Sequence, residues 1–525
     1  MATVDERPGV AASAPPPRRV HPVVAGLRNS WRQLTSMRTA LVLLLLLALA
    51  AIPGSVLPQR QTNINEVNAY AAEHPRLAPV LDRLGAFDVF ASPWFGAIYL
   101  LLFTSLVGCI VPRLRDHVRA LRAAPPAAPQ RLDRLPQHAV VAGHGGDVQE
   151  IAAVLRRRRW RVAVRDNTVS AEKGYLKETG NLLFHTALVG VLVGVALGSW
   201  YGWHANRLLV AGPDTAFCNG LQQYDEYGLG YRVDPGDLPR FCLELTDFRA
   251  TYLDSGQASS FRATARLDGD GRPAREVNFS VNDPLRLGGA NVYLLGNGYA
   301  PIVRYTDRYG QTQETVAPFL TVDEMLTGEG VAAFPDANVD PKTGRREARQ
   351  QVAFEGLYLP TAPATGPFVR SAFPEERAPA LNLVAYRGDL GLDAGIPSSV
   401  YRLDRRQVDA GRLAEVGSKL LRVGESWTLD DGTTLEFVGT RRYVVLAVRQ
   451  DPGERIVLGS VAVMLAGLML SLTGKRRRVW FRVGPSPTGG SSTLVGAGGL
   501  PRTDYPGFAE EFSQLIRDVE TREQG

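Results

Sequence analysis

Cysteine and histidine are both scarce in this sequence. Its 525 residues include three cysteines and seven histidines, too few cysteines for a disulfide-rich scaffold or a cysteine-built metal cluster. No histidine occurs between residues 205 and 454, so a histidine-built zinc or copper site, a Ser-His-Asp triad or a Cys-His dyad cannot lie wholly in that stretch. The chain also lacks a Walker loop, a GxSxG motif and a CxxC motif. These absences argue against an independent soluble enzyme.

A large charge excess of one sign is missing as well. The 59 Lys and Arg residues against 53 Asp and Glu give a net charge of +6, with both signs interspersed along the chain. A nucleic-acid-binding protein would gather its basic residues on one face or in one stretch. We therefore expect no nucleic-acid partner.

The apolar residues are concentrated in four uninterrupted runs, at residues 40–57, 94–112, 182–202 and 456–473. Each run has roughly 18 to 21 residues and no formal charge, enough to cross a hydrocarbon core of about 30 Å. A cleavable signal peptide is the alternative for the first run. The length of that run and its lead-in of nearly 40 residues favour an uncleaved anchor. The sequence therefore predicts four transmembrane α-helices.

The basic residues near these runs predict the orientation of the protein. Arginines precede the first run, crowd the segment between the second and third runs, and follow the fourth run. The loop between the first two runs has only three arginines, balanced by four acidic residues. We expect a multi-pass protein of the bacterial plasma membrane, in contact with lipid, with both termini in the cytoplasm.

This orientation divides the chain into nine parts. They are a cytoplasmic tail (1–39), span 1 (40–57), an extracytoplasmic loop (58–93), span 2 (94–112), a cytoplasmic α/β segment (113–181), span 3 (182–202), an extracytoplasmic domain (203–455), span 4 (456–473) and a cytoplasmic tail (474–525).

The cytoplasmic parts show weaker local patterns. Residues 1–27 are rich in Ala and Pro and are predicted to be disordered. The α/β segment is expected to contain a strand at 139–142, an amphipathic helix at 148–158 and short strands at 161–164 and 168–172. The run Arg156–Arg159 is either a contact for anionic lipid headgroups or the solvated end of that helix. Residues 484–499 have the composition of a linker, and an amphipathic helix that docks on protein or membrane follows, with its apolar stripe at Phe508, Phe512, Leu515, Ile516 and Val519.

The large segment after span 3 alternates between apolar and polar residues, as β-strands do. The alternation is clearest at 241–248, 260–267 and 298–305, and turn sequences occur at 268–271 and 430–432. We expect a β-rich domain, an all-β sandwich or open barrel, between spans 3 and 4.

His185 is the most prominent candidate for chemistry, because an ionisable group within a span is rare. Gly190, Gly194 and Gly198 recur every four residues on the same helix, a stripe that lets another helix approach closely. His185 lies on the side opposite Gly194. It is either a ligand to something held beside the helix or an interfacial histidine hydrogen-bonded to a neighbouring helix.

The remaining candidates are weaker. Cys109, at the end of span 2, fits a small buried side chain better than a ligand or reactive thiol. Cys218 and Cys242 both lie in the predicted extracytoplasmic domain, where a disulfide closing a loop of about 24 residues would stabilise the fold by roughly 3 kcal/mol; a redox dithiol is the alternative. His74 and His204 fit ordinary surface residues better than ligands.

Several stretches, in order around the four spans, resemble the ResB family of cytochrome c biogenesis proteins of system II, also called CcsB. The resemblance covers roughly residues 30–482 and rests on Ile52–Gln59, Leu84–Phe95, Ser105–Arg113, Lys173-Gly174, Gly180–Thr186, Val281–Leu285, Val292-Tyr293, Gly298–Pro301, Asp451–Gly453 and Arg476–Trp480.

The resemblance implies a membrane subunit of a cytochrome c maturation complex that transports haem b and presents it for attachment to apocytochrome c outside the membrane. It implies that His185 is an axial haem ligand, paired with a histidine of a ResC/CcsA-type partner. That partner carries the tryptophan-rich haem-binding segment, so this chain is not expected to be an enzyme alone, only a subunit of a haem-lyase complex. A thioredoxin-like thiol reductant is a further expected partner.

Haem also suits the pattern of residues. A carrier for this flat, apolar dicarboxylate needs an imidazole for the iron and cations at the rim. From position alone, Lys173 and Lys177 are candidates for contact with the propionates. The extracytoplasmic domain is expected to hold apocytochrome or the partner's loops. Two alternatives remain, a scaffold for apocytochrome that never binds haem and a membrane-tethered receptor.

Overall fold

The computed structural model describes residues 21–60, 64–144, 147–213, 215–345, 348–365, 367–391, 401–485, 493–502 and 506–520. The chain forms two compact units. One comprises residues 1–196 together with 453–525, and the other comprises residues 197–452. Each unit is described below by itself.

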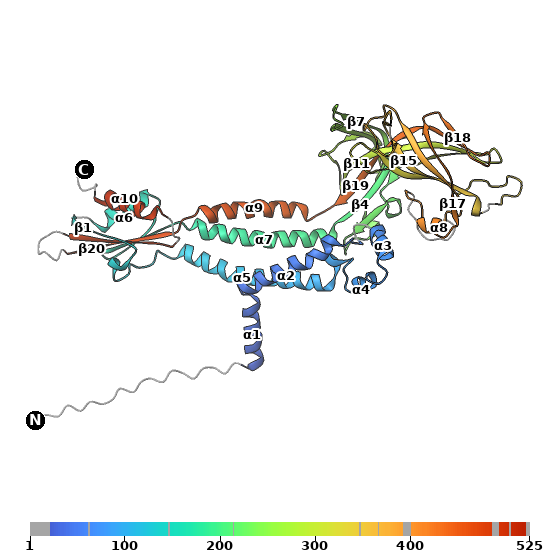
Figure 1. Ribbon diagram of the computed structural model, residues 1–525. Helices are drawn as coiled ribbons and strands as arrows, with labels where there is room; N and C mark the ends of the chain where they lie inside the picture. The colour runs from blue at the N-terminus through green and yellow to red at the C-terminus, as the bar shows by residue number, and fades with distance from the viewer. Residues whose placement is uncertain are drawn as a thin grey trace, which may run out of the picture. The chain divides into compact units, whose positions relative to one another are not determined.

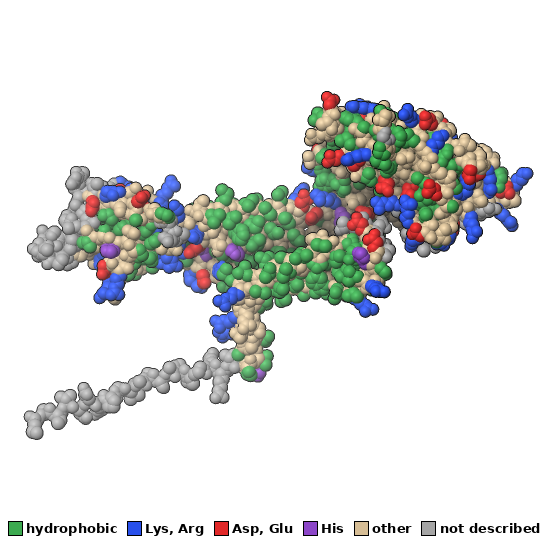
Figure 2. Space-filling model, in the orientation of Figure 1, with side chains coloured by type: hydrophobic (Ala, Val, Ile, Leu, Met, Phe, Trp, Pro, Cys, Tyr) green, Lys and Arg blue, Asp and Glu red, His purple; other side chains and the backbone are tan. Residues whose placement is uncertain are grey.

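Four helices in the first unit are long and apolar enough to cross a membrane (Figure 1). They are α2 (Met37–Val56), α5 (Pro93–Arg122), α7 (Leu176–Tyr201) and α9 (Glu454–Thr473). Little of each apolar stretch is buried inside the protein, and Figure 2 shows hydrophobic side chains covering their surface. The prediction of four transmembrane helices is confirmed.

Two of these helices continue beyond their apolar runs. Helix α5 passes Pro112 and extends to Arg122, because the segment 113–122 consists largely of the good helix formers Arg, Leu and Ala. Helix α7 begins six residues before Leu182. Both helices therefore carry polar turns at the ends that face the strands of the same unit.

Helix α7 packs closely on α9 through glycine. A Cβ atom on Gly180 would lie 2.5 Å from the backbone nitrogen of Ser471, and one on Gly194 would lie 2.7 Å from Cγ2 of Val457. On α9, a Cβ on Gly467 would lie 2.7 Å from the backbone nitrogen of Phe184. The stripe of small residues on this helix brings another helix close, as predicted from its spacing.

Short helices accompany α2 and α5. Helices α3 (Ile64–Glu73) and α4 (Ala78–Arg83) and the 3₁₀ turn η1 (Val89–Ala91) connect the two spans. Before α2 stands α1 (Pro22–Leu34), so the prediction of disorder over residues 1–27 is wrong for 22–27. Pro22 at the first helical position and an apolar repeat of three to four residues explain the helix. Residues 1–20 lie outside the described chain.

A small α/β domain completes the first unit. Its five antiparallel strands have the order β1-β21-β20-β3-β2, and two helices pack on the sheet (Figure 1). The elements are β1 (Gln137–His144), α6 (Val148–Arg157), β2 (Arg161–Arg165), β3 (Thr168–Lys173), β20 (Arg477–Pro485), β21 (Thr493–Pro501) and α10 (Phe508–Glu520), with the turn η2 (Leu132–Arg134).

The linker predicted at 484–499 is wrong for most of its length. Strands β20 and β21 form an antiparallel pair there, and residues 486–492 lie outside the described part. The glycines that suggested a linker make room for packing, since a Cβ on Gly499 would lie 2.8 Å from the Phe512 ring. The docking helix is confirmed: α10 places Phe508, Phe512 and Leu515 in the core of the small domain.

The second unit is a β domain, as predicted, and its described residues form three sheets. The first sheet has the order β10-β11-β19-β4-β6, and β12 and β18 pair with β11 and β19 beside this path. The second sheet has the order β13-β14-β15-β16-β17, and the third has the order β5-β7-β8-β9. The strands are β4 (Trp203–Val210), β5 (Phe217–Cys218), β6 (Glu226–Leu229), β7 (Cys242–Tyr252), β8 (Ala258–Asp268), β9 (Arg275–Phe279), β10 (Leu285–Leu287), β11 (Ala290–Thr306), β12 (Thr312–Val316), β13 (Leu320–Thr321), β14 (Gly328–Phe334), β15 (Gln351–Leu359), β16 (Ala380–Gly388), β17 (Leu413–Arg422), β18 (Ser426–Thr428) and β19 (Thr434–Gln450).

Helical pieces in this domain are short: η3 (Leu221–Gln223), η4 (Pro235–Asp237), η5 (Ala348–Gln350) and α8 (Arg405–Asp409). The two 17-residue strands β11 and β19 pair along their length and serve two hydrophobic cores. Their halves near Val292 and Val448 pack against the sheet of β7 and β8. Their other halves, near Tyr305 and Leu435, pack against the sheet of β14–β16. The domain is thus a double sandwich that shares one long sheet.

Candidate functional site

His185 lies in α7 and makes one hydrogen bond within its own helix. Its Nδ1 atom lies 2.7 Å from the backbone carbonyl oxygen of Asn181, one turn earlier. A carbonyl oxygen only accepts, so Nδ1 carries a proton and donates it, and the tautomer with this proton has its lone pair on Nε2. In the part of the chain that the structure describes, no residue hydrogen-bonds to this Nε2.

The imidazole projects from the side of α7 opposite the contact with α9. Gly194, half a helical turn around from His185, is the residue that meets Val457 of α9. Leu192, two turns beyond His185 and close to the same face, accepts a hydrogen bond through its carbonyl from Tyr99 of α5. The imidazole is partly exposed and meets the Phe184 ring edge to face at 5.3 Å.

This arrangement suits ligation of a metal carried from outside the chain. An imidazole whose Nδ1–H is hydrogen-bonded presents a fixed, more basic Nε2 to a metal ion. Among the described residues there is no group of three or more His, Cys, Asp or Glu that could hold a bare metal ion. The Nε2 atom of His185 is thus a single donor atom without a cluster of further metal-binding side chains among the described residues.

The two candidate lysines have different surroundings. Lys173 ends β3, and its Nζ donates to the Arg158 carbonyl at 2.9 Å and lies 5.8 Å from the centre of the Trp160 ring. Burial, together with the charge of Arg477, lowers the pKa of Lys173. Lys177 lies in the first turn of α7, where its backbone packs against Gly474.

The other candidates lie on other elements than His185. His74 follows α3 and stacks edge to face on Tyr70 at 4.5 Å. His204 lies on β4 of the β domain. Cys109 donates to the Thr35 carbonyl at 2.7 Å, which agrees with a structural part for this side chain. Cys218 and Cys242, on the paired strands β5 and β7, form a disulfide.

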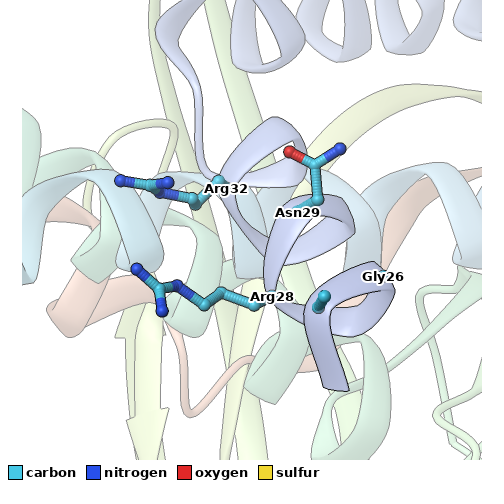
Figure 3. Close-up of a pocket in the computed structure, with 5 residues that line it drawn as sticks. Gly26, Arg28, Asn29 and Arg32 are labelled. Atoms are coloured by element: carbon cyan, nitrogen blue, oxygen red, sulfur yellow. The ribbon is translucent and has the colours of Figure 1, made fainter. Parts of the chain in front are cut away.

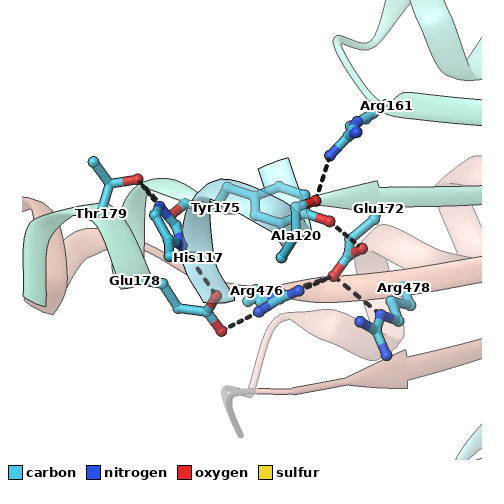
Figure 4. Close-up of polar contacts among 9 residues, drawn as sticks. All are labelled: His117, Ala120, Arg161, Glu172, Tyr175, Glu178, Thr179, Arg476 and Arg478. Carbon is cyan, nitrogen blue, oxygen red and sulfur yellow. Dashed lines mark hydrogen bonds and ion pairs between the residues drawn. The ribbon is translucent and has the colours of Figure 1, made fainter. Parts of the chain in front are cut away.

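Sequence reasoning missed a buried polar network where the small domain meets the long helices (Figure 4). The Glu172 side chain, at the end of β3, is fully buried. It accepts hydrogen bonds from Arg476 at 2.7 Å, from Arg478 at 3.0 Å and from the Tyr175 hydroxyl at 2.5 Å. Burial would raise the pKa of Glu172, but these hydrogen bonds and the two guanidinium charges outweigh it and hold that pKa below its ordinary value.

The network extends from the strands to two helices. Arg476 also pairs with Glu178 of α7, and Nδ1 of His117 on α5 lies 3.7 Å from Glu178. Nε2 of His117 lies 3.0 Å from the Thr179 hydroxyl. The network thus joins α5, the start of α7 and the chain after α9. Its sequence signal was the alternation of Arg476 and Arg478, which puts both side chains on one face of a strand.

Together these features define a class: a four-span membrane protein with a large β domain between its third and fourth spans and a ligand-competent histidine in the third. The chain belongs to the ResB-like family, whose model matches residues 37–513. The resemblance predicted from the sequence is therefore confirmed.

Curated relatives share most of their length with this chain. It is 26% identical over 504 residues to the cytochrome c biogenesis protein CcsB of Synechococcus sp. (strain CC9311), covering 94% of this chain and 98% of that protein. It is 26% identical over 512 residues to the protein of the same name from Gloeobacter violaceus, covering 93% of this chain and 90% of that one. With CcsB of Thermosynechococcus vestitus it shares 27% over 379 residues, 69% of this chain and 82% of the other.

Proposed function

We propose that this protein is a membrane subunit of a cytochrome c maturation complex and that it carries haem b, as cargo, for attachment to apocytochrome c. Family membership and relatives named cytochrome c biogenesis protein support the process. One observation supports the haem step. His185 lies within a span, and its Nδ1 atom is hydrogen-bonded to Asn181, so its Nε2 atom is available to bind a metal.

In this proposal His185 supplies one axial ligand to the haem iron. The partly exposed face of α7 around His185 carries the Phe184 ring, against which a flat macrocycle can pack. The second ligand comes from a ResC/CcsA-type partner, because the described residues place no second histidine against His185. Lys173 and Lys177 remain candidates for the propionates, and Lys173 would first have to leave Arg158 and Trp160.

The proposed orientation places the β domain outside the bacterial plasma membrane and both termini in the cytoplasm. The arginines around the small domain and before α2 support it. The disulfide in the β domain fits an oxidising compartment. The β domain lacks histidine from residue 205 on, so it offers the haem iron no imidazole there. We therefore propose that it binds apocytochrome or the partner's loops. A thioredoxin-like reductant would serve the apocytochrome thiols.

The haem step is tested on the full chain purified with its membrane partner. A pyridine haemochrome assay and a visible spectrum are recorded for the wild type and for His185→Ala, with His74→Ala as a matched histidine control. We expect His185→Ala to lose or shift the haem band and added imidazole to restore it, while His74→Ala keeps the wild-type spectrum. Equal haem in all three proteins would move the ligand away from His185.

The same preparations separate haem delivery from the alternative function. The β domain spans residues 203–450 without providing an imidazole after His204, which is the feature that favours a scaffold for apocytochrome. If the partner copurifies but neither wild type nor mutant contains haem, the scaffold is the better description.

A further inference from the structure

Helix α1 carries an apolar face that the described chain leaves largely exposed, with part of the Trp31 ring beside Gly108 of α5. None of its residues is buried, and Val23, Val24, Leu27 and Trp31 are between 53% and 67% exposed. At 100° per residue these side chains fall within one sector of the helix. An isolated helix of 13 residues is marginal in water, so this face needs a surface to pack against.

The edge of this apolar face is cationic. Arg28 and Arg32 lie one turn apart, and Figure 3 shows both side chains projecting to the same side of α1. With Ala25, Gly26 and Asn29 they line an open hollow of about 450 Å³. Two like charges four residues apart repel each other, and an anion held between them would remove the repulsion. The sequence has no acidic residue between positions 7 and 65, and neither arginine forms an ion pair with a described residue.

The direction of α1 is fixed by contacts with the spans. The last carbonyls of the helix are satisfied by α5, because Ser105 donates to Leu34 at 2.5 Å and Cys109 donates to Thr35 at 2.7 Å. A Cβ on Gly108 would overlap the Thr35 side chain. Ser36 then caps the start of α2 by accepting from the Thr39 backbone at 3.2 Å.

These contacts place the end of α1 beside the last two turns of the apolar run of α5, which ends at residue 112. The span α2 begins directly after Ser36, and Figure 1 shows α1 running across the direction of α2 and α5. A helix that leaves the end of a span in this way lies in the plane of the headgroups. Its apolar face can then enter the acyl region while the arginines at its edge extend to phosphate.

We propose that α1 is an interfacial anchor that binds anionic lipid, with Leu27 and Trp31 inserted below the headgroups and Arg28 and Arg32 bound to a lipid phosphate. The end of α1 is held against α5 by Ser105, Gly108 and Cys109. A lipid-bound α1 therefore also fixes the position of α5 in the membrane. The occupant is a lipid surface because the helix is continuous with a span and its charge is of one sign. This inference does not depend on haem.

The test uses spin labels on the full chain reconstituted in vesicles. Cys109→Ser, which keeps a hydrogen-bond donor, removes the free thiol, and single cysteines are then placed at Val24, Leu27, Asn29 and Gln33. Collision rates are measured with oxygen, which concentrates in lipid, and with a water-soluble nickel chelate. We expect the Val24 and Leu27 labels to meet oxygen and the Asn29 and Gln33 labels to meet nickel, in vesicles of phosphatidylcholine and phosphatidylglycerol.

Lipid charge supplies the second readout. The spin label at Leu27 divides between a membrane-immersed and a water-exposed population, and the ratio of the two measures the anchoring. This ratio should fall by roughly thirtyfold when the vesicles contain phosphatidylcholine alone. It should fall by a similar factor in anionic vesicles when Arg28→Gln and Arg32→Gln are introduced together. The matched control is Arg262→Gln with Arg266→Gln, two exposed arginines of β8, which should leave the ratio unchanged.

Two results would overturn the proposal. Four labels equally accessible to nickel would mean that α1 stands free in water. Labels at Val24 and Leu27 shielded from both reagents would mean that protein, from a second copy or a partner, covers the face.

Discussion

At the residue scale, the attachment of the small domain depends on one buried carboxylate. Glu172 is held by Arg476, Arg478 and Tyr175, and it anchors the chain that follows α9 to the strand that precedes α7. A buried charge that loses its partners costs several kcal/mol. The arginines that indicate the orientation of the protein are thus also structural counter-ions, and removing Glu172 should disturb the junction more than it disturbs the sheet.

The lowered pKa of Glu172 predicts a stability that depends on pH. Because the folded pKa lies below the unfolded value, the carboxylate stabilises the fold at pH values above about 4.5, and this contribution is lost as pH falls through the folded pKa. At neutral pH we expect Glu172→Gln to destabilise the protein by about 2 kcal/mol. Thermal unfolding of both proteins in detergent measures the difference, which should shrink below about pH 4.5. A difference that stays constant between pH 7 and pH 3 would contradict this account.

The two lysines near the start of α7 should respond differently to substitution. Lys173→Ala removes a contact with Trp160 and a hydrogen bond to Arg158, so we expect a loss of roughly 1 kcal/mol of stability. Lys177→Ala should instead lower haem content at unchanged protein yield if, as proposed, the Lys177 ammonium contacts a propionate. Haem per protein is compared with that of Lys342→Ala, a lysine of the β domain. Unchanged haem occupancy in Lys177→Ala would remove this residue from the site.

At the scale of elements, the packing of α7 on α9 should not tolerate a larger side chain in place of the glycines at their contact. Gly180→Leu puts a Cβ 2.5 Å from the Ser471 nitrogen, so the helices must separate, at a cost of about 1–3 kcal/mol. Gly459→Leu is the matched control, because a Cβ there meets nothing within 4 Å. We expect a lower unfolding temperature in detergent for Gly180→Leu and no change for Gly459→Leu. Equal effects would mean that the close approach does not stabilise the pair.

The elements differ in how far the sequence predicted them, and the reason is physical. The four spans and strands such as β7 and β8 have a local pattern, an apolar run or an alternation, and were predicted. The hairpin of β20 and β21 was missed because its glycines weaken local strand preference. Their place is explained by tertiary packing: Gly499 lies against the Phe508 and Phe512 rings of α10, and Gly498 lies against Leu132 and Leu135. Helix α1 was missed because a Pro/Ala-rich start concealed its short amphipathic repeat.

The candidate site shows the same division. His185 could be singled out because a histidine within a span is conspicuous, and its side of the helix followed from the glycine stripe. The Nδ1 bond to Asn181 depends on a rotamer that no spacing encodes. The polar network needed three distant stretches, around His117, Glu172 and Arg476, and only the assembled sheet brings them together.

At the scale of the whole chain, the small domain ties together segments that lie far apart in the sequence. Strand β20, which follows the last span, is inserted between β21 and β3, so the sheet cannot form before α9 has been made. Helix α10 then covers the sheet together with α6, and Arg158 pairs with Asp518 across them. Residues 474–525, predicted as a tail, are for most of their length an integral part of this domain.

Truncation of the chain tests this interdependence. Removing residues 474–525 would leave β3 with β2 as its one neighbour, β1 without its partner β21, and Glu172 without both arginines. The remaining strands should therefore not hold their fold. We expect trypsin to cleave the truncated protein rapidly at the arginines between residues 156 and 165, in membranes opened to the protease. The full chain should resist there, because α6 and β2 are packed into the domain core. A chain lacking only residues 521–525 is the control and should resist as the full chain does. Equal protection of 156–165 in the long truncation would show that the first half of the domain folds without the second.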